Sequence, residues 1–320
     1  MVHSDSMSGQ GSLGPETGRE VVVLVNQKAR RSALAQSEIV EGLTGSGLRV
    51  RRYVSFQHVG RLREVAREEI RAGAPLVVVG GGDGTFSAIA GEFARTTTAL
   101  GVLPLGTGNA FARDLGIPAD LKSACEIIAA GKVASVDMGV VGGREFLNVA
   151  TVGLTTQIAR GLDPAQKKRF GRVAYLVSVL RALRDVQPFH AVIDLQTTVE
   201  DFDSLLVVIG NGRFHAGPFP VSEDASIKGG RLAIYALASK RKTDLVKVAL
   251  RMLGGGRPKF DEIRSFQASA GRLSTDPIQS LTSDGEISLR TPVDFGIVAG
   301  ALRVVVPHDF NDRAAGSNGV

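Results

Sequence analysis

Short apolar runs alternate with longer segments of mixed polarity along the first half of the chain. The run EVVVLVN, which begins at Glu20, is rich in β-branched residues, a pattern typical of a strand buried on both faces. In chain order the pattern predicts that strand, a helix over 32–43, a strand LRVRRYVSF, a helix over 58–72, a strand over 75–79, a helix over 85–94, a strand over 99–103 and a short helix over 109–115. This alternation predicts an α/β domain with a doubly wound sheet.

The pattern changes after Ser135, where strands follow strands. The segment VDMGVVGGREFLNVATVGL indicates two short strands joined by a turn at Gly142 and Gly143. A basic helical stretch over 171–184 and a further helix over 243–253 interrupt the later strands. Those strands are HAVIDLQ, SLLVVIGN, RLAIYAL, RSFQASAG and EISLRT. They predict a second, mainly antiparallel β domain, and the last apolar segment, ALRVVVP, is expected to return to the first domain.

These patterns divide the chain into a disordered tail at 1–18, an α/β domain at 19–138 to which 292–310 return, a β-rich domain at 139–291 and a flexible tail at 311–320. The first tail is rich in Gly and Ser and has no apolar core of a signal peptide. The longest apolar runs are broken by Gly or charge, so no membrane-spanning segment is expected.

The formal net charge of +6 favours an anionic partner: nucleic acid, a phosphorylated ligand or an acidic membrane surface. Nucleic acid is disfavoured because no helix-turn-helix, zinc-ligand cluster or aromatic-rich surface stands out in the sequence. A solvated basic surface without a partner is the alternative. Cys125 is the single cysteine, which excludes an intramolecular disulfide and fits a reducing cytoplasm. It lies in the apolar stretch SACEIIAA and is expected to be a buried, inert thiol.

Candidate chemistry begins with GGGDGT, residues 80–85, where a predicted buried strand ends and a helix begins. Glycines there let the backbone approach a phosphate, and the N–H groups of the helix N-terminus attract its charge. Asp83 would coordinate Mg²⁺ or orient a hydroxyl group. The lysine of a Walker A loop and the G-x-G-x-x-G spacing of a dinucleotide loop are both missing. The alternative is a glycine-rich turn in which Asp83 only caps the helix.

A second loop of the same kind is PLGTGN, residues 104–109, in which Thr107 and Asn109 offer side-chain hydrogen bonds. Two phosphate-compatible loops at the carboxyl ends of successive strands imply one crevice. GGGDGT followed by PLGTGNAFARDLG resembles the catalytic domain of diacylglycerol, sphingosine and ceramide kinases and their bacterial lipid-kinase relatives. The likeness continues through FLNVATVG, KKRFGRVAYL, NGRFHAG and SDGE and covers most of residues 20–307.

The resemblance implies an ATP-dependent lipid kinase with an NAD-kinase-like α/β domain and a β domain, with ATP and the lipid meeting between them. Residues 19–138 would bind ATP, and residues 139–291 would bind the lipid, which is expected to be diacylglycerol or a sphingoid base. The residues that would hold the ATP phosphates are Gly81, Gly82, Asp83, Gly84 and Thr85, and Gly106, Thr107, Asn109 and Asn26 would complete the nucleotide pocket.

Asp284, in SDGE, matches the family position proposed as the base that takes the proton from the lipid hydroxyl. Glu286 would lie close by at the cofactor, and Asp83 and Glu286 are the candidate ligands of Mg²⁺. The hydroxyl needs only positioning and partial deprotonation, because phosphoryl transfer depends mainly on in-line geometry and charge neutralisation by the metal. Without the resemblance, Asp-Gly between two strands is more typical of a hairpin turn.

Three positions depart from the family pattern. Gln27 follows Asn26 where the family usually has Pro, and Ala110 stands where many bacterial relatives have Asp, although sphingosine kinases similarly carry Ala. The segment Ile227, Lys228, Gly229, Gly230 replaces an Asp-Asp-Gly turn that supports a structural metal in bacterial relatives, so no structural Mg²⁺ is expected there. Asp137, in VDMG, retains another acidic position of the family.

The segment QKKRFGRVAYLVSVLRALR combines basic residues at 167–169 and at Arg172 with apolar residues at helical spacing. It indicates either a surface that meets anionic headgroups or a core helix with a solvated basic end. The first interpretation predicts a cytoplasmic protein whose partner is a lipid at the inner membrane surface; a homodimer also stays open. His190 and His215 lack a ligand pattern and are expected to be packing or surface residues.

Two other functions stay open. A kinase of a soluble polyol or nucleotide would share the NAD-kinase-like first domain, but the family-like β domain argues against it. A catalytically silent protein that binds a nucleotide or a lipid is disfavoured because it would have no chemical need to retain Asp83, Asn109 and Asp284 together.

Overall fold

A computed structural model describes residues 18–29, 36–130, 132–153, 186–214, 225–244 and 263–310. They form two compact units. Unit 1 contains the described residues of Met1–Val136 and Gly300–Asp312, and unit 2 contains those of Asp137–Ala299. The boundaries predicted from the sequence are at 138 and 292. Within the described ranges, no helix is both long and apolar enough to span a bilayer.

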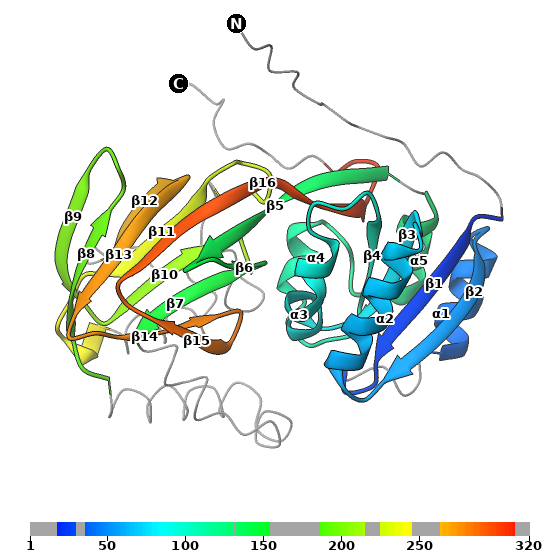
Figure 1. Ribbon diagram of the computed structural model, residues 1–320, viewed down its shortest axis with the longest axis horizontal. Coiled ribbons are helices and arrows are strands. Elements are labelled where there is room, and N and C mark those ends of the chain that lie inside the picture. The colour runs from blue at the N-terminus through cyan, green and yellow to red at the C-terminus, as the bar shows by residue number, and fades with distance from the viewer. Residues whose placement is uncertain are drawn as a thin grey trace, which may run out of the picture. The chain divides into compact units, whose positions relative to one another are not determined.

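Unit 1 is built on a sheet with the strand order β2-β1-β3-β4-β16 (Figure 1). The strands are β1 (Glu20–Asn26), β2 (Arg49–Phe56), β3 (Leu76–Gly81), β4 (Ala99–Pro104) and the C-terminal part of β16 (Val293–Val306). Each neighbouring pair in this order is parallel. Every residue of β3 and β4 is buried, which explains why these strands are uniformly apolar in sequence.

The helices of unit 1 are α1 (Gln36–Gly45), α2 (Val59–Arg71), α3 (Asp83–Phe93), α4 (Ala110–Asp114) and α5 (Leu121–Ala130). Helix α1 packs against α5, and α2 packs against α3. The crossover from β1 to β2 runs in the opposite direction along the sheet to that from β2 to β3. Because such crossovers are right-handed, α1 and α2 cover opposite faces. The predicted doubly wound α/β fold is confirmed.

Cys125 of α5 is fully buried, and a Cβ at Gly42 of α1 would lie only 3.0 Å from its sulfur. Burial raises the pKa of the thiol to about 11. The thiol therefore stays protonated near neutral pH, where only a thiolate would be reactive.

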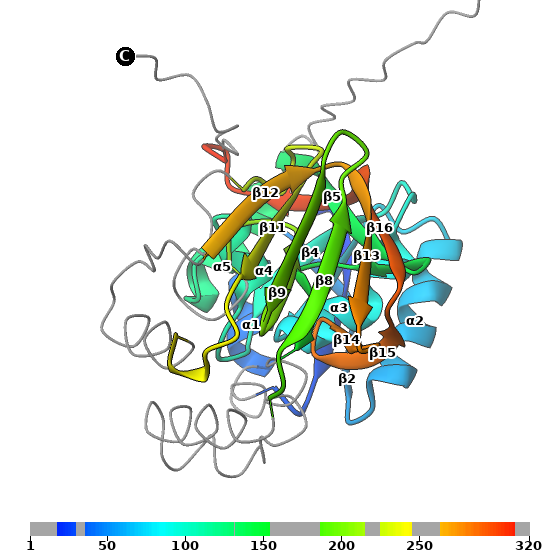
Figure 2. The ribbon, with the colours of Figure 1, turned by 90° about the vertical axis from the view of Figure 1, so that its left-hand side faces the viewer.

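Unit 2 contains two sheets that share one core. One has the strand order β12-β11-β10-β7-β14-β15, and the other contains β16-β13-β8-β9, with β5 pairing with β16 and β6 (Figures 1 and 2). The strands are β5 (Lys132–Val141), β6 (Arg144–Phe146), β7 (Val149–Gly153), β8 (Phe189–Asp194), β9 (Val199–Ser204), β10 (Leu206–Gly210), β11 (Leu232–Leu237), β12 (Ile263–Ala268), β13 (Ala270–Asp276), β14 (Ser280–Ser283) and β15 (Glu286–Arg290). Inward side chains of both sheets, such as Ile193, Ile234 and Leu273, form the core.

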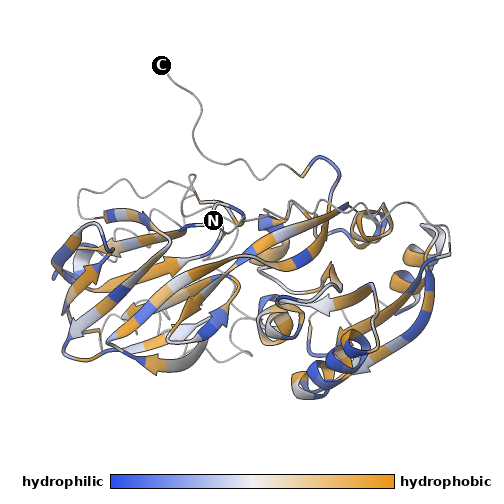
Figure 3. Cartoon of the chain, turned by 45° about the horizontal axis from the view of Figure 1, so that its top comes forward, coloured by the Kyte–Doolittle hydropathy of each residue, from blue (hydrophilic) through white to orange (hydrophobic). Residues whose placement is uncertain are grey.

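Burial alternates along β8, where Phe189, Ala191 and Ile193 are buried and the residues between them are partly exposed. Figure 3 shows the same alternation of hydrophobic and hydrophilic residues along strands of unit 2. One face of such a strand meets the core and the other meets solvent, unlike the strands of unit 1 that are buried on both faces. The predicted, mainly antiparallel β domain is confirmed.

The strand boundaries of unit 2 differ from the prediction at several places. The segment after Ser135 forms three strands, β5, β6 and β7, where two were predicted, because residues 147 and 148 leave the ladder to bond elsewhere. RSFQASAG is divided between β12 and β13. The polar sequences of β9 and β14 were not predicted as strands. The predicted helices over 171–184 and 243–253 lie outside the described residues, apart from 243–244.

Candidate active site

Three polar or glycine-rich segments of unit 1 meet at one edge of its sheet. Asn26, Gly81 and Pro104 end the adjacent parallel strands β1, β3 and β4, and Gly81 pairs directly with Pro104. The N–H of Leu105 donates to the Gly81 carbonyl at 2.8 Å, which ties the second loop to the end of β3. The carboxyl ends of parallel strands share an edge, so the segments that follow them gather there.

Thr85 is the side chain around which the first loop folds. It is almost fully buried, and a Cβ at Gly81 would come within 2.5 Å of its Cβ and Oγ1, so only glycine fits at position 81. Asn26 Nδ2 donates to Thr85 Oγ1 at 2.8 Å, and the N–H of Lys28 donates to Asn26 Oδ1 at 3.0 Å. Asn26 and Thr85 therefore fasten the end of β1 to the first turn of α3.

The two glycine-rich loops touch through their backbones. A Cβ on Gly106 would lie 2.6 Å from the Cα of Gly82. Asn109 closes the second loop, because its Nδ2 donates to the Gly106 carbonyl at 3.1 Å and its Oδ1 accepts from the Gly106 N–H at 3.0 Å. Its φ of 50° is left-handed, a conformation that Asn adopts more readily than most residues. The carboxamide of Asn109 thus shapes the loop backbone, whereas Thr107 is exposed.

Asp83 links the two loops. Its Oδ1 accepts a hydrogen bond from the N–H of Phe111, in α4, at 3.2 Å, and a Cβ on Gly108 would lie 2.9 Å from its Oδ2. Phe86 and Phe111 are fully buried, with ring centroids 5.9 Å apart, and hold α3 against α4. The carboxylate therefore caps α4, the helix that follows the second loop.

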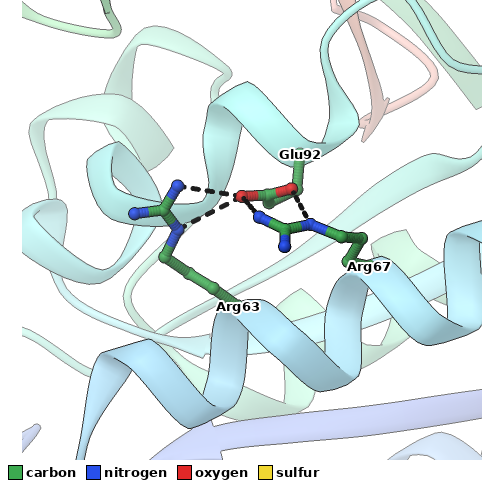
Figure 4. A network of polar contacts seen from close by, with 3 residues as sticks. All are labelled: Arg63, Arg67 and Glu92. Carbon is green, nitrogen blue, oxygen red and sulfur yellow. Dashed lines mark hydrogen bonds and ion pairs between the residues drawn. The ribbon is translucent and has the colours of Figure 1, made fainter.

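The C-terminal turn of α3 is anchored by an ion-pair network (Figure 4). Glu92 Oε1 accepts from Arg63 at 2.9 Å and from Arg67 at 2.8 Å, and its Oε2 accepts from Arg67 Nε at 2.8 Å. The Glu92 side chain is 11% exposed, while both arginines of α2 are about half exposed. The hydrogen bond from Arg67, reinforced by Arg63, holds the pKa of Glu92 below its usual range. The network joins α2 to α3, whose other end carries the first loop.

In unit 2, the candidate base is held by backbone N–H groups. Asp284 has a left-handed φ of 48° in the turn between β14 and β15. Its Oδ2 accepts from the N–H of Leu147 at 2.8 Å, and its Oδ1 accepts from those of Asn148 at 2.9 Å and Val149 at 3.0 Å. Its own N–H donates to the Val149 carbonyl at 2.8 Å. The SDGE turn is therefore a hairpin whose carboxylate is clamped by the FLNVATVG segment.

Asn211 lies behind this clamp and is fully buried. Its Nδ2 donates to the carbonyls of Asp137 and Leu147, each at 2.9 Å, and its N–H donates to the Asn148 carbonyl at 2.8 Å. The Oδ1 atoms of Asn148 and Asn211 are buried and accept no hydrogen bond from the described residues. No role for Asn211 was predicted, although it follows the apolar run SLLVVIG and begins the segment NGRFHAG, which carries part of the family likeness.

The turn at 226–230 is closed by hydrogen bonds. Asp137 Oδ2 accepts from the Gly230 N–H at 2.8 Å, and the Asp137 N–H donates to the Ile227 carbonyl at 2.8 Å. Across the described ranges, no three His, Cys, Asp or Glu side chains gather where they would hold a metal. The residues of this turn do not fit the structural Mg²⁺ of bacterial relatives, because Lys228 and two glycines bring no carboxylate.

The surroundings of Asp83 fit a Mg²⁺ ion that arrives with a phosphate. Such an ion is commonly held by one or two carboxylates, together with water and phosphate oxygens. Asp83 supplies one carboxylate between the two glycine-rich loops. The side chain of Glu286, the other predicted metal ligand, lies outside what the structure describes.

The remaining predicted residues are not gathered at these positions. The basic segment at 167–184 and His215 lie outside the described residues. His190 Nε2 lies 3.0 Å from Asp201 Oδ1, and Lys240 Nζ lies 2.8 Å from Asp203 Oδ2. These four side chains are substantially exposed, so His190 is a surface residue, as predicted.

Comparison with known proteins gives matches over both units of the chain. Residues 20–141 match the model of the diacylglycerol kinase catalytic domain, and residues 148–306 match that of the YegS C-terminal NAD kinase beta sandwich-like domain. A Pseudomonas aeruginosa (strain UCBPP-PA14) protein named "Probable lipid kinase YegS-like" is 31% identical over 286 residues, covering 88% of this chain and 90% of that protein.

Two proteins of lower sequence identity, a curated relative and a solved structure, are named diacylglycerol kinases. The diacylglycerol kinase of Bacillus subtilis (strain 168) is 25% identical over 253 residues, covering 78% of this chain and 84% of that protein. The crystal structure of a diacylglycerol kinase from Bacillus anthracis str. Sterne has the same fold, with a TM-score of 0.72 and 21% identity over 91% of this chain and 97% of that one. The chain thus belongs to the YegS-like lipid kinases, the family that carries a diacylglycerol kinase catalytic domain.

Proposed function

We propose that this protein transfers the γ-phosphate of ATP to a hydroxyl of a membrane lipid, diacylglycerol or a sphingoid base, with the help of Mg²⁺. The observation that carries the proposal is the pair of glycine-rich loops that touch at Gly82 and Gly106 beside the N-terminus of α3. Membership in the lipid kinase family supports the reaction class, and the names of the relatives support a lipid acceptor.

The glycine-rich loops of unit 1 suit a triphosphate because glycine has no side chain that would keep phosphate oxygens away from the backbone N–H groups. The first N–H groups of a helix lack partners within that helix, and its positive end favours phosphate. At Gly84 a Cβ would meet no heavy atom within 4 Å, so the first turn of α3 has open space beside it. The shape of this backbone surface is fixed by the hydrogen bonds of Thr85, Asn26 and Asn109.

Asp83 would hold the Mg²⁺ that accompanies ATP, and this ion would neutralise charge on the phosphates. The carboxylate is already oriented by the N–H of Phe111, which limits the rotamers that it can adopt. Preorganisation of this kind reduces the entropy lost on binding. Asp83 is thus proposed as both a metal ligand and the residue that keeps the two loops in register.

Asp284 would take the proton of the lipid hydroxyl. The hydroxyl oxygen forms a bond to the γ-phosphorus, the bond from that phosphorus to the bridging oxygen breaks, ADP leaves and the proton moves to the carboxylate. A carboxylate has about four lone-pair sites, and the described residues occupy three of them with N–H donors. One lone pair remains for the hydroxyl, in an orientation fixed by the clamp.

Mass-resolved phosphate transfer tests the proposal. The protein would be given Mg·ATP with labelled γ-phosphate and a total lipid extract in mixed micelles, together with Asp83→Ala and Asp284→Asn. Asp294→Asn is the matched control, because Asp294 is an exposed residue of unit 2 that pairs only with Arg272 among the described side chains. We expect one labelled lipid that depends on Asp83 and Asp284 and not on Asp294, and its mass would identify the acceptor.

The same assay separates the other two functions. Turnover of a soluble hydroxyl compound that micelles do not raise would favour an NAD-kinase-like activity. Binding of ATP without transfer to any lipid would favour a nucleotide-binding protein without kinase activity. Either result would contradict the lipid kinase proposal.

A further inference from the structure

Two consecutive peptide groups connect Asn211 to Asp284. In the group between Leu147 and Asn148, the carbonyl accepts from Asn211 Nδ2 at 2.9 Å and the N–H donates to Asp284 Oδ1 at 2.9 Å. In the next group, the Asn148 carbonyl accepts from the Asn211 N–H at 2.8 Å and the Val149 N–H donates to the same carboxylate oxygen at 3.0 Å. Asn211 therefore holds the far side of two of the three peptide groups that hold Asp284.

We infer that Asn211 is a positioning residue for Asp284, an assignment that rests on the proposed function. A peptide group is planar, so fixing the direction of its carbonyl also fixes the direction of its N–H. Hydrogen bonds in such a chain also polarise one another, which strengthens the N–H donors at the carboxylate. The position of the carboxylate is thereby set by a side chain that does not touch it.

The burial of Asn211 supports this role. The residue is fully buried, and a buried amide is favoured only where it makes hydrogen bonds. A leucine of similar size would lose both N–H donations from Nδ2. The two bonds to Asp137 and Leu147 are thus what the carboxamide contributes at this position.

The rest of the network fixes Asn211 itself. Its second acceptor, the Asp137 carbonyl, belongs to β5, and the side chain of Asp137 is held by the Gly230 N–H. Strand β10, which Asn211 follows, pairs with β7, where Gly210 lies opposite Val149. Asn211 therefore joins β5 and β10 to the turn before β7, and small shifts there would reach Asp284.

Asn211→Leu tests the assignment through kinetics. We expect kcat to fall by about 10- to 100-fold, as for a small displacement of a reacting group, with the KM for ATP unchanged because the nucleotide loops lie in unit 1. In an Asp284→Asn background, the same substitution should lower the residual kcat little further, since the group that it positions is already gone. A parallel fall in both backgrounds would overturn the assignment.

Hydrogen exchange gives a second readout that does not need kinase activity. The N–H groups of residues 147–149 should exchange faster in Asn211→Leu and in Asn211→Ala, which removes the amide without adding apolar bulk. Ser204→Ala is the control, because Ser204 is also fully buried in unit 2 and its hydroxyl bonds to the Leu206 and Leu237 carbonyls. It should leave the exchange of 147–149 unchanged.

The two readouts separate the inference from the proposed function. If the unaltered protein phosphorylates no lipid but Asn211 variants speed exchange at 147–149, the proposed function fails and the link between Asn211 and the clamp stands. If the protein is an active kinase and neither kcat nor this exchange responds to Asn211, the positioning role is wrong.

Discussion

The candidate site residues of the two units differ in which groups their hydrogen bonds orient. In unit 1, side chains orient the backbone. The Asn109 carboxamide bonds to the N–H and the carbonyl of Gly106, and Asp83 accepts from the N–H of Phe111. In unit 2, the backbone orients a side chain, because three consecutive N–H groups donate to the carboxylate of Asp284. The first arrangement shapes a backbone surface, and the second fixes one carboxylate.

This difference indicates what each unit contributes. A backbone surface at a helix N-terminus suits an anionic ligand that is recognised by N–H groups. A single carboxylate fixed by several donors suits a step in which one group must be oriented precisely. Substitutions in the glycine-rich loops of unit 1 should therefore change nucleotide affinity, whereas substitutions at the Asp284 clamp of unit 2 should change kcat. Each prediction below tests one side of this comparison.

The largest effect on nucleotide affinity is expected for Gly106→Ala. The added Cβ would lie 2.6 Å from the Cα of Gly82, a backbone atom that cannot move without separating the loops. Such overpacking typically costs about 1–3 kcal/mol, and we expect the affinity for Mg·ATP, measured by calorimetry, to fall by the corresponding factor of about 5- to 150-fold. Gly60→Ala is the control, because a Cβ there would meet nothing within 4 Å. Unchanged ATP affinity in Gly106→Ala would show that the loop contact does not form the nucleotide site.

The next effect is expected for Asp284→Asn, which should lose most of its turnover, keep only a small residual kcat and lose some stability. The carboxamide puts an NH₂ group where one oxygen accepts an N–H, so at least one hydrogen bond is lost and two donors face each other. We expect the free energy of unfolding, measured with urea, to fall by about 1–3 kcal/mol. The affinity for ATP should not change. A stable variant that keeps its kcat would show that the clamp serves neither purpose.

The regular parts of both units were predictable because their hydrophobic period is strong. Strand β3 is apolar at every position and helix α2 has a clear apolar face, so both were placed within two residues of their bounds. Strand β9, with the sequence VEDFDS, lies at the end of its sheet order, where only Phe202 and Ser204 are buried. Edge strands need few apolar residues, and this one therefore gives almost no period-2 signal.

The site was predictable in its loops and not in its hydrogen bonds. GGGDGT and PLGTGN are local, so their positions after strands follow from sequence. The clamp joins Asp284 to residues 147–149, and Asn211 comes from a third segment, so no local pattern reports it. Backbone N–H donors are present at every non-proline residue, and sequence does not show which of them converge.

Glu92→Gln tests whether the first loop depends on the ion pairs of α3 or on its contact with the second loop. We expect stability at pH 7 to fall by about 1 kcal/mol, since the charge-assisted bonds to Arg63 and Arg67 weaken but the arginines are half exposed. The affinity for ATP should stay unchanged, because Gly82 is held by Gly106. Lost ATP affinity would mean that α2 and α3 set the nucleotide site.

The pH dependence of this variant has a defined sign. The folded-state pKa of Glu92 is lowered, so its contribution is fully present above the unfolded value of about 4.3 and is lost as pH falls through the lower folded value. The stabilities of Glu92→Gln and the unaltered protein should therefore converge at acidic pH. Glu64→Gln, at an exposed pair with Arg61, should change stability little at any pH.

The smallest effect on stability is expected when Mg²⁺ is removed from the protein in the absence of nucleotide. The turn at 226–230 is closed by the hydrogen bond from the Gly230 N–H to Asp137, so chelation with EDTA should leave the thermal midpoint unchanged while it abolishes phosphate transfer. A midpoint that rises with Mg²⁺ in the absence of ATP would contradict this, because it would require a metal that stabilises the folded chain by itself. The comparison predicts that the ion enters only with ATP, at the loops of unit 1, and that Asp284 is held by N–H groups without it.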